Sequence, residues 1–183
     1  FNGSASSEIT GLDSIIAASG SIGGINGSTQ TFWRSYVDST SEALSIADMR
    51  TAKNSANLGM GGKNVSIIVT TQTLFEKYQS LLSASYQMNP LSTGESKRLG
   101  DGGFTSVEFE GVPVVFDEAA TSGVMYFINT NNFKLGVHKD GYFQPIKKSE
   151  PTNQHLAVSH IHFFGNTICD RRASLAKLSA KTA

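Results

Sequence analysis

Two histidines in the C-terminal part of the sequence, His160 and His162, are the residues whose type and spacing could bind a metal. Side chains two positions apart project from the same face of a strand, so a strand here would present both imidazoles together. A zinc site needs at least one further protein ligand. His138 or His155 could supply it only if the fold brought one of them close, because no residue at a fixed metal-binding spacing does so. We therefore predict a polar strand face and no metal site.

The glycine-rich segment "GMGGKN", residues 59–64, is the nearest approach to a phosphate-binding loop. A P-loop requires the pattern G-x-x-x-x-G-K-[ST] after a strand and before a helix. Here Asn57 and Asn64 replace the first glycine and the final hydroxyl residue, and the segment follows a predicted helix. Glycines just beyond the last turn of a helix commonly cap its C-terminus. We predict that Gly59 ends a helix and that no phosphate is bound.

The residues that could act as nucleophiles or as an acid–base pair are not arranged for catalysis. Asp117 and Glu118 are adjacent at the end of a predicted strand, where neighbouring side chains point to opposite faces. Cys169 is the only cysteine, which excludes an internal disulfide and a CxxC site. In "NTICD" it is expected to be a small buried apolar residue. No G-x-S-x-G motif occurs, so the sequence predicts neither an enzyme nor a cofactor.

The composition is that of a protein with few surface charges. Of 183 residues, 39% are hydrophobic and only 16% are charged, against about 25% charged residues in typical globular domains. The 15 basic and 15 acidic residues cancel, which argues against nucleic-acid binding driven by an excess of positive charge. No apolar run approaches the roughly 18 residues of a membrane span. We expect one domain or two small ones, in a reducing or redox-indifferent compartment, with part of the surface covered by partners.

Two helices are predicted on either side of a buried strand. Ser39–Glu42 fits the S-x-x-E capping box, so a helix is expected over residues 42–57. The apolar run "NVSIIVT", residues 64–70, has the character of a buried strand. Apolar residues at helical spacing in "TTQTLFEKYQSLL" predict a second helix, with Thr70 or Thr71 as its N-cap. This order predicts two helices that cover one face of a sheet.

Strands dominate the second half of the chain. Residues 104–118 alternate in polarity on both sides of a turn at Glu110-Gly111, and Pro113 indicates an edge strand or a first strand position. Further strands are expected up to a turn at Asp140-Gly141, and a last long strand over residues 154–170. A short basic tail follows. Together these elements predict the α+β class.

An aromatic cluster in "GGINGSTQTFWRS", residues 23–35, is the first candidate for a binding surface. Phe32 and Tyr36 are four residues apart and could share a helix face. Tryptophan and arginine are among the residue types most enriched at interface anchor positions, so Trp33 and Arg34 are predicted interface residues. The alternative, that Trp33 packs into the core of its own domain, stays open.

Two further segments are candidates for contacts with partners. Arg171 and Arg172 open the basic tail and are predicted interface residues, although adjacent basic residues are more often a solvated surface. The polar segment 85–103 is long for a loop inside a compact domain, and such loops are usually functional. We expect both segments at the molecular surface.

The order of several motifs resembles the major capsid proteins of tailed bacteriophages. These motifs are "GLDSI", "GGIN", "FWRS", "IIVTTQTLFEKYQSLL", "FEGVPVVFDE" and "MYFINT", followed by a closing basic strand. The resemblance spans the chain from about Gly11 onward, and "VTTQTLFEKY" with "FEGVPVVFD" is its most specific part. It implies an HK97-like fold. Residues 1–38 would be a peripheral-domain or connecting segment, 39–118 an axial domain with a sheet flanked by helices, and 119–183 the return into a strand-rich peripheral domain.

The resemblance also implies a structural function. Such a protein assembles with copies of itself into the capsomers of an icosahedral shell around packaged DNA, with a scaffold, portal or maturation protease as further partners. It needs no catalytic residues, cofactor, metal or membrane, and it occurs in the virion and, during assembly, in the host bacterial cytoplasm. Capsid proteins of this kind usually begin with an N-terminal arm, an extended loop and a spine helix. None of these precedes Phe1, so the chain is expected to be a fragment.

Two other functions stay open on the sequence alone. A small carbohydrate-binding or adhesive domain would line a groove with aromatic residues on strands, such as Tyr126, Phe127, Tyr142 and Phe143. A hydrolase would use Asp117 or one of the histidines. The shell protein is the first interpretation, because none of these residues belongs to a recognisable catalytic pattern.

Overall fold

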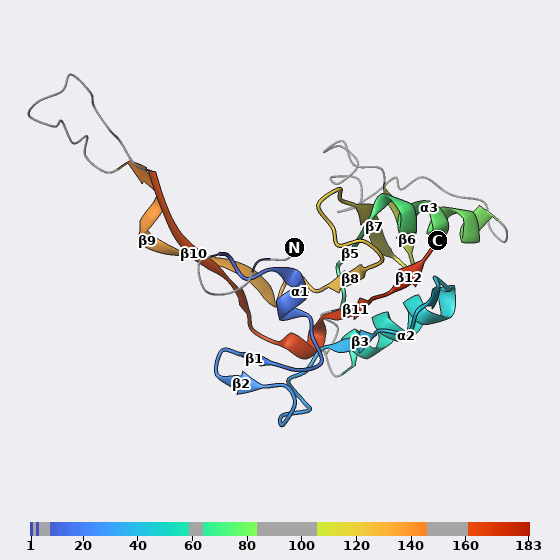
Figure 1. The fold of residues 1–183 in the computed structure, drawn as a ribbon, viewed down its shortest axis with the longest axis horizontal. Coiled ribbons are helices and arrows are strands. Elements are labelled where there is room, and N and C mark those ends of the chain that lie inside the picture. The colour runs from blue at the N-terminus through green and yellow to red at the C-terminus, as the bar shows by residue number, and fades with distance from the viewer. Residues whose placement is uncertain (2, 4–7, 59–63, 84–105, 146–160) are drawn as a thin grey trace, which may run out of the picture.

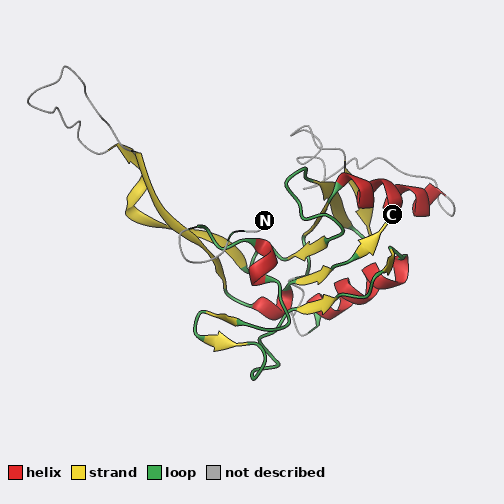
Figure 2. Cartoon of the chain, viewed as in Figure 1, coloured by secondary structure: helices red, strands yellow, loops and turns green. Residues whose placement is uncertain are grey.

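The computed structural model of the chain describes residues 1, 3, 8–58, 64–83, 106–145 and 161–183. Its outline is elongated, because a long two-stranded ribbon runs out from a body of helices and sheet (Figure 1). Strands outnumber helices in this body (Figure 2), as expected for the predicted α+β class. The described elements are α1 (Leu12–Ile15), β1 (Ser21–Ile22), β2 (Ile25–Asn26), β3 (Tyr36–Asp38), β4 (Glu42–Ala43), α2 (Ile46–Asn57), β5 (Ile67–Thr70), α3 (Gln72–Ser83), β6 (Ser106–Phe109), β7 (Val112–Phe116), β8 (Met125–Ile128), β9 (Phe133–Pro145), β10 (Ile161–Cys169), the 3₁₀ helix η1 (Arg172–Ser174), β11 (Ala176–Leu178) and β12 (Lys181–Thr182).

Six strands form the central sheet in the order β3–β11–β8–β5–β7–β6. β11 pairs in parallel with β3, and β5 pairs in parallel with β7, whereas the other neighbours are antiparallel. The C-terminal segment, expected to be a basic tail, therefore supplies an internal strand. The strands of this sheet come from all three of the segments 1–38, 39–118 and 119–183.

Alternation along the strands gives each face of the sheet its own core. On β8, Met125 and Phe127 belong to the cluster that includes both long helices, whereas Tyr126 and Ile128 belong to the cluster on the opposite face. The prediction of two helices on one face is confirmed. Burying one such side chain contributes roughly 1.5–3 kcal/mol. The helix residues in the first cluster are Met49, Ala52, Ala56, Leu74, Phe75 and Tyr78.

Helix α2 begins at Ile46, later than the sequence predicts. Its N-cap is Ser45, whose Oγ accepts a hydrogen bond from the backbone N–H of Asp48 at 3.2 Å. The predicted capping box at Ser39–Glu42 is wrong, because Glu42 begins β4, which pairs in parallel with β12. A hydroxyl residue followed three positions later by an acidic one recurs at Ser45 and Asp48, and this second instance caps the helix.

The strand–helix unit that follows is confirmed. β5 lies within the predicted range 64–70, and α3 begins directly after Thr71, one of the two predicted N-caps. The carbonyl of Thr71 accepts a hydrogen bond from the backbone N–H of Phe75 at 3.0 Å. Thr70 instead belongs to β5, and its buried hydroxyl donates to the carbonyl of Val124 at 3.0 Å.

The hairpin of β6 and β7 turns at the predicted residues. Glu110 and Gly111 have φ of 48° and 80°, and two consecutive positive φ angles are typical of the type I′ turn that suits a two-residue hairpin. The sequence predicts Pro113 at an edge strand or at a first strand position. β7 is not an edge strand, because it lies between β5 and β6, and Pro113 is its second residue. The ladder with β5 begins only at Val114, so the missing N–H of Pro113 falls outside that ladder.

The turn predicted at Asp140-Gly141 is wrong as well. β9 continues through these residues to Pro145 and pairs with β10 to make the ribbon. The pairing changes register between Gly165↔Val137 and Phe163↔Tyr142. The β9 residues between Val137 and Tyr142 therefore form a bulge-like irregularity within the strand, and the chain does not turn back there.

Several predictions concern residues outside the described ranges. These are Gly59 as a helix cap, the loop 85–103, His155 and His160, and the first part of the strand predicted over 154–170. Within the described ranges, β10 confirms the rest of that strand. None of the helices that the structure describes is long and apolar enough to cross a membrane.

Candidate assembly interface

The ribbon of β9 and β10 carries most of the exposed apolar side chains that the structure describes. Nine large hydrophobic residues are exposed in the described part of the chain, and six of them lie on this ribbon. They are 50–68% exposed, although isolated two-stranded hairpins are at best marginally stable in water. Clustered exposed apolar side chains mark surfaces that bind something. These six residues are Leu135, Tyr142, Phe143, Ile161, Phe164 and Ile168.

The base of the ribbon is anchored to the body of the molecule. Phe133 and Cys169 pack against the core cluster that contains α1. The backbone N–H of Thr10 donates to Oδ1 of Asn166 at 2.7 Å, and the hydroxyl of Thr167 donates to the carbonyl of Thr10 at 2.6 Å. Burial raises the pKa of the Cys169 thiol, which suits the apolar role predicted for this residue. The ribbon is therefore held firmly at one end and runs away from the body beyond it (Figure 1).

The aromatic segment around Trp33 is a turn followed by a strand. The backbone N–H of Trp33 donates to the carbonyl of Gln30 at 3.0 Å, and Tyr36 begins β3, so the predicted helix face shared by Phe32 and Tyr36 is wrong. Phe32 is 69% exposed, and Arg34 is exposed beside it. Trp33 is half-buried, and among the described residues its buried indole N–H has no acceptor. Phe32 and Arg34 are thus the parts of this segment that a partner can reach.

The two adjacent arginines have opposite environments. Arg171 is exposed, whereas Arg172 is fully buried, which corrects the expectation that both lie at the surface. The guanidinium of Arg172 donates to the carbonyls of Ile15 at 2.5 Å, Ser19 at 2.7 Å and Gly20 at 3.1 Å. Burial lowers the pKa of Arg172, but arginine stays protonated at neutral pH. No sequence pattern distinguishes the two residues, because the carbonyls that Arg172 binds lie far away along the chain.

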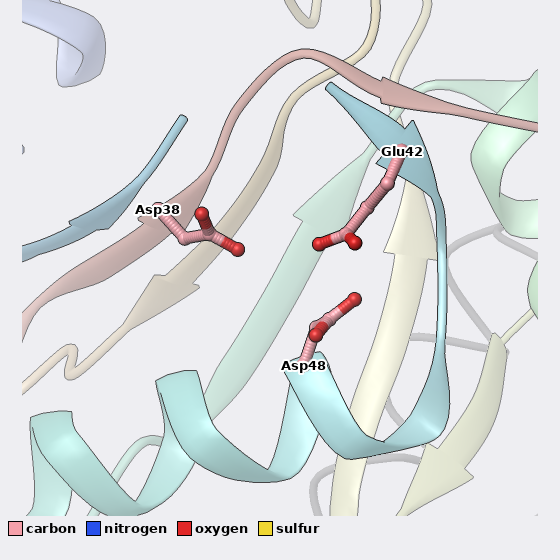
Figure 3. A group of neighbouring side chains, drawn as sticks. All are labelled: Asp38, Glu42 and Asp48. Atoms are coloured by element: carbon pink, nitrogen blue, oxygen red, sulfur yellow. The ribbon is translucent and has the colours of Figure 1, made fainter. Parts of the chain in front are cut away.

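Three carboxylates, those of Asp38, Glu42 and Asp48, point toward one another (Figure 3). They lie beside the last strand of the chain, β12. Such a group could hold a metal ion. Here, however, the ammonium of Lys181 lies 2.8 Å from Asp38, 2.6 Å from Glu42 and 3.4 Å from Asp48. The side chain of Lys181 has no exposed surface. The lysine thus takes the place a cation would occupy, and the cluster fastens β12 to β4 and α2.

The electrostatics of this cluster follow from its geometry. The hydrogen bond from Lys181 lowers the pKa of Asp38 to about 2. Burial alone would lower the pKa of Lys181, but hydrogen bonds to Asp38 and Glu42 outweigh it and raise that pKa. Both shifts favour the charged forms, so the cluster is an ion pair network at neutral pH. Sequence reasoning missed it, because Lys181 lies 133 or more positions along the chain from the carboxylates that it binds.

The residues proposed for other functions are dispersed. Tyr126 and Phe127 are fully buried in two different clusters, so they cannot line a carbohydrate groove, whereas Tyr142 and Phe143 are exposed. Oδ1 of Asp117 accepts a hydrogen bond from the backbone N–H of Ala119 at 2.8 Å, as in an ordinary Asx turn. The arrangement therefore gives Asp117 a local structural role.

Comparison with solved structures identifies the architecture. In the cyanophage A-1(L) capsid asymmetric unit, one chain matches with a TM-score of 0.70 over 96% of this chain, at 17% sequence identity. The chain has the HK97-like fold. The same HK97-like architecture matches the SrpI encapsulin of Synechococcus elongatus PCC 7942, with a TM-score of 0.59 over 80% of this chain at 9% identity. It also matches the putative capsid protein of a prophage of E. coli CFT073, with a TM-score of 0.51 over 73% of this chain at 12% identity.

The HK97-like chain is shorter than these neighbours. It covers 60% of the cyanophage chain, 53% of the encapsulin and 46% of the prophage protein. No protein-family model matches the sequence. No curated protein matches it either. The likeness therefore lies in the arrangement of helices and strands and concerns the fold.

Proposed function

We propose that this chain is a structural subunit of an icosahedral bacteriophage or prophage shell, which assembles with copies of itself around packaged DNA. The observation that supports this most strongly is the match of 96% of the chain, at a TM-score of 0.70, to a chain of the cyanophage capsid. The resemblance of the sequence motifs to tailed-phage major capsid proteins supports it independently. The protein would reside in the virion and, during assembly, in the cytoplasm of the host bacterium.

The exposed ribbon gives this proposal a physical basis. A shell subunit buries large apolar areas against its neighbours, and the ribbon, which runs away from the body (Figure 1), carries six exposed apolar side chains. Many modest contacts repeated around a closed shell add up through multivalency. The low content of charged residues, 16%, suits a surface that other subunits cover.

In this proposal the six-stranded sheet with α2 and α3 corresponds to the axial domain. The ribbon, with the N-terminal segment packed at its base, corresponds to the peripheral domain. Trp33, Arg34 and Arg171 stay candidate interface residues, whereas Arg172 supports the interface from inside the fold. A scaffold, a portal or a maturation protease would act as further partners.

A carbohydrate-binding or adhesive domain is the second candidate function. The observation in its favour is the exposed pair of Tyr142 and Phe143, whose ring centroids lie 5.4 Å apart. Isothermal titration with bacterial surface glycans would test it. Saturable heat that the Tyr142→Ala variant abolishes would support this candidate, and the absence of heat would remove it.

The shell proposal is tested by negative-stain microscopy of the longest natural polypeptide that contains residues 1–183. Uniform closed particles at micromolar concentration are the expected result. A polypeptide that stays monomeric in sedimentation velocity at every concentration and salt condition would contradict the proposal. Particles of undefined size and shape would contradict it as well, because closed shells have defined symmetry.

A further inference from the structure

The segment between α1 and β3, residues 17–34 and here called the arm, has little internal structure of its own. Its hairpin of β1 and β2 consists of two residue pairs, and it projects from the body (Figure 1). The arm contains four glycines, and most of its residues are exposed, Gly27 alone being buried. Glycine-rich backbone loses much conformational entropy when it is fixed, and a two-stranded hairpin is at best marginally stable in water. Contacts with the body must therefore determine the conformation of the arm.

The guanidinium of Arg172 binds the first part of the arm through its backbone. It donates to the carbonyls of Ser19 at 2.7 Å and Gly20 at 3.1 Å, and to that of Ile15 at the end of α1. Its three acceptors among the described residues are thus all main-chain carbonyls. The planar fork of a guanidinium requires each acceptor to lie in a defined direction. Arg172 therefore fixes the path of the backbone, whichever side chains these residues carry.

Gly27 closes the arm against the same guanidinium. Its N–H donates to the carbonyl of Gly20 at 3.0 Å, so this one oxygen accepts hydrogen bonds from both Gly27 and Arg172. A Cβ atom on Gly27 would lie 3.0 Å from Nη1 of Arg172 and 3.4 Å from Cβ of Arg34. Non-bonded carbon atoms prefer separations of about 3.5–4.0 Å. A side chain at position 27 would therefore push the arm away from Arg172.

The backbone of Arg172 binds the other end of the arm. Its carbonyl accepts a hydrogen bond at 2.7 Å from the hydroxyl of Ser35, a buried residue directly after the arm. Two turns lie between these attachment points. The backbone N–H of Gln30 donates to the carbonyl of Asn26 at 2.9 Å, and that of Trp33 donates to the carbonyl of Gln30 at 3.0 Å. Arg172 thus holds the arm at both ends, and the turns fix the part that carries the exposed side chains.

We propose that Arg172 is a positioning residue of the candidate interface, which holds the arm in the conformation that presents Phe32 and Arg34. Phe32 is 69% exposed, and Arg34 is exposed beside it. The inference rests on the proposed function, because it takes these two side chains as contacts with a neighbouring subunit. A surface segment that is ordered before it binds avoids the entropy loss of ordering on binding. The buried arginine thereby strengthens a contact that it does not touch.

Hydrogen exchange with mass spectrometry tests the positioning directly, in the longest natural polypeptide that contains the chain. We expect Arg172→Lys and Gly27→Val to raise the exchange rate of arm peptides about tenfold, the factor that corresponds to 1.4 kcal/mol of local opening. Peptides that cover β8 should be less affected in Arg172→Lys and unaffected in Gly27→Val. Ser28→Val, at the exposed neighbouring position, is the matched control and should leave both rates unchanged. Wild-type rates in the arm of both variants overturn the inference, as does equal acceleration of the arm and β8, which would be a loss of overall stability.

Assembly tests whether the position of the arm matters for the contact. We expect Phe32→Ser and Gly27→Val each to raise the concentration needed for assembly about tenfold, as measured by sedimentation velocity and microscopy. The double variant should be no worse than the more damaging single variant, because both changes remove the same contact. Additive losses overturn the inference, as does unchanged assembly of Phe32→Ser, and in both cases shells still form and the proposed function stands. A wild-type polypeptide that never assembles defeats the proposed function, and this inference with it.

Discussion

The Nζ atom of Lys181 lies 2.6 Å from Oε1 of Glu42, although 139 positions separate the two residues. The contact holds the C-terminal strand β12 beside β4, just before the N-terminus of α2. The buried ammonium faces three carboxylates, so the C-terminal end of the chain is fixed by charge as well as by strand pairing. The same C-terminal segment supplies β11 inside the central sheet. Loss of this contact should therefore lower the stability of the central sheet as well as that of β12.

Replacing Lys181 by methionine should lower the free energy of unfolding by about 3–5 kcal/mol, because three carboxylates would lose their buried cation. Urea denaturation followed by circular dichroism measures the change. The matched control is Lys134→Met, which breaks an exposed ion pair with Asp170 and should cost less than about 1 kcal/mol. Equal losses for the two variants would show that burial of Lys181 contributes nothing.

The same cluster predicts an acid dependence of stability. The pKa of Asp38 is lowered to about 2 from an ordinary value of 3.8. Ionised Asp38 therefore stabilises the fold fully above about pH 4, and this contribution is lost as the pH falls toward 2. In the Asp38→Asn variant, the free energy of unfolding should be lower at pH 7 and should fall less steeply between pH 4 and 2.5. Parallel curves for the variant and the wild type would argue against the assignment, and exposed Glu118→Gln serves as the control.

The two adjacent arginines provide an internal comparison. Arg172→Met should lower the free energy of unfolding by about 3 kcal/mol, because it leaves the carbonyls of Ile15, Ser19 and Gly20 without their donor. Arg171→Met should change it by less than about 0.5 kcal/mol, as for most exposed positions. Arg172→Lys should recover only part of the loss, since an ammonium cannot reproduce the planar fork of a guanidinium. Full recovery by lysine would contradict the geometry.

Local signals in the sequence predicted the elements that depend on local residues. The turn at Glu110-Gly111, strand β5 and helix α3 follow from turn chemistry and from apolar spacing within a few positions. The misplaced features depend on distant partners. Glu42 fits a helix cap by its local sequence, but it is in a strand because β4 pairs with the distant β12. Asp140-Gly141 fits a turn by its local sequence, but it is in a strand because β9 pairs with β10.

The candidate interface was predictable only in part. The exposed Arg34 and Arg171 could be named from residue type, whereas the burial of Arg172 depends on carbonyls more than 150 positions away. The ribbon itself had a readable signal, because "IHFFGNTIC" carries apolar residues at both odd and even positions. A strand covered on one face would alternate more strictly. That pattern indicates a strand that needs cover on both faces, but it does not say which molecule provides the cover.

The start of α2 can be tested at two serines that lie six residues apart in the sequence. Ser45→Ala should lower the free energy of unfolding by about 1 kcal/mol, because its Oγ accepts the hydrogen bond from the backbone N–H of Asp48 at 3.2 Å. Ser39→Ala is the control: Ser39 is exposed and precedes β4, so its replacement should change stability by less than about 0.5 kcal/mol. Ser45→Asp should keep most of the wild-type stability, since aspartate is an equally good N-cap and its charge suits a helix N-terminus. If Ser39→Ala were the more damaging change in urea denaturation, the helix would begin at the earlier capping box, and β4 could not pair with β12 as it does.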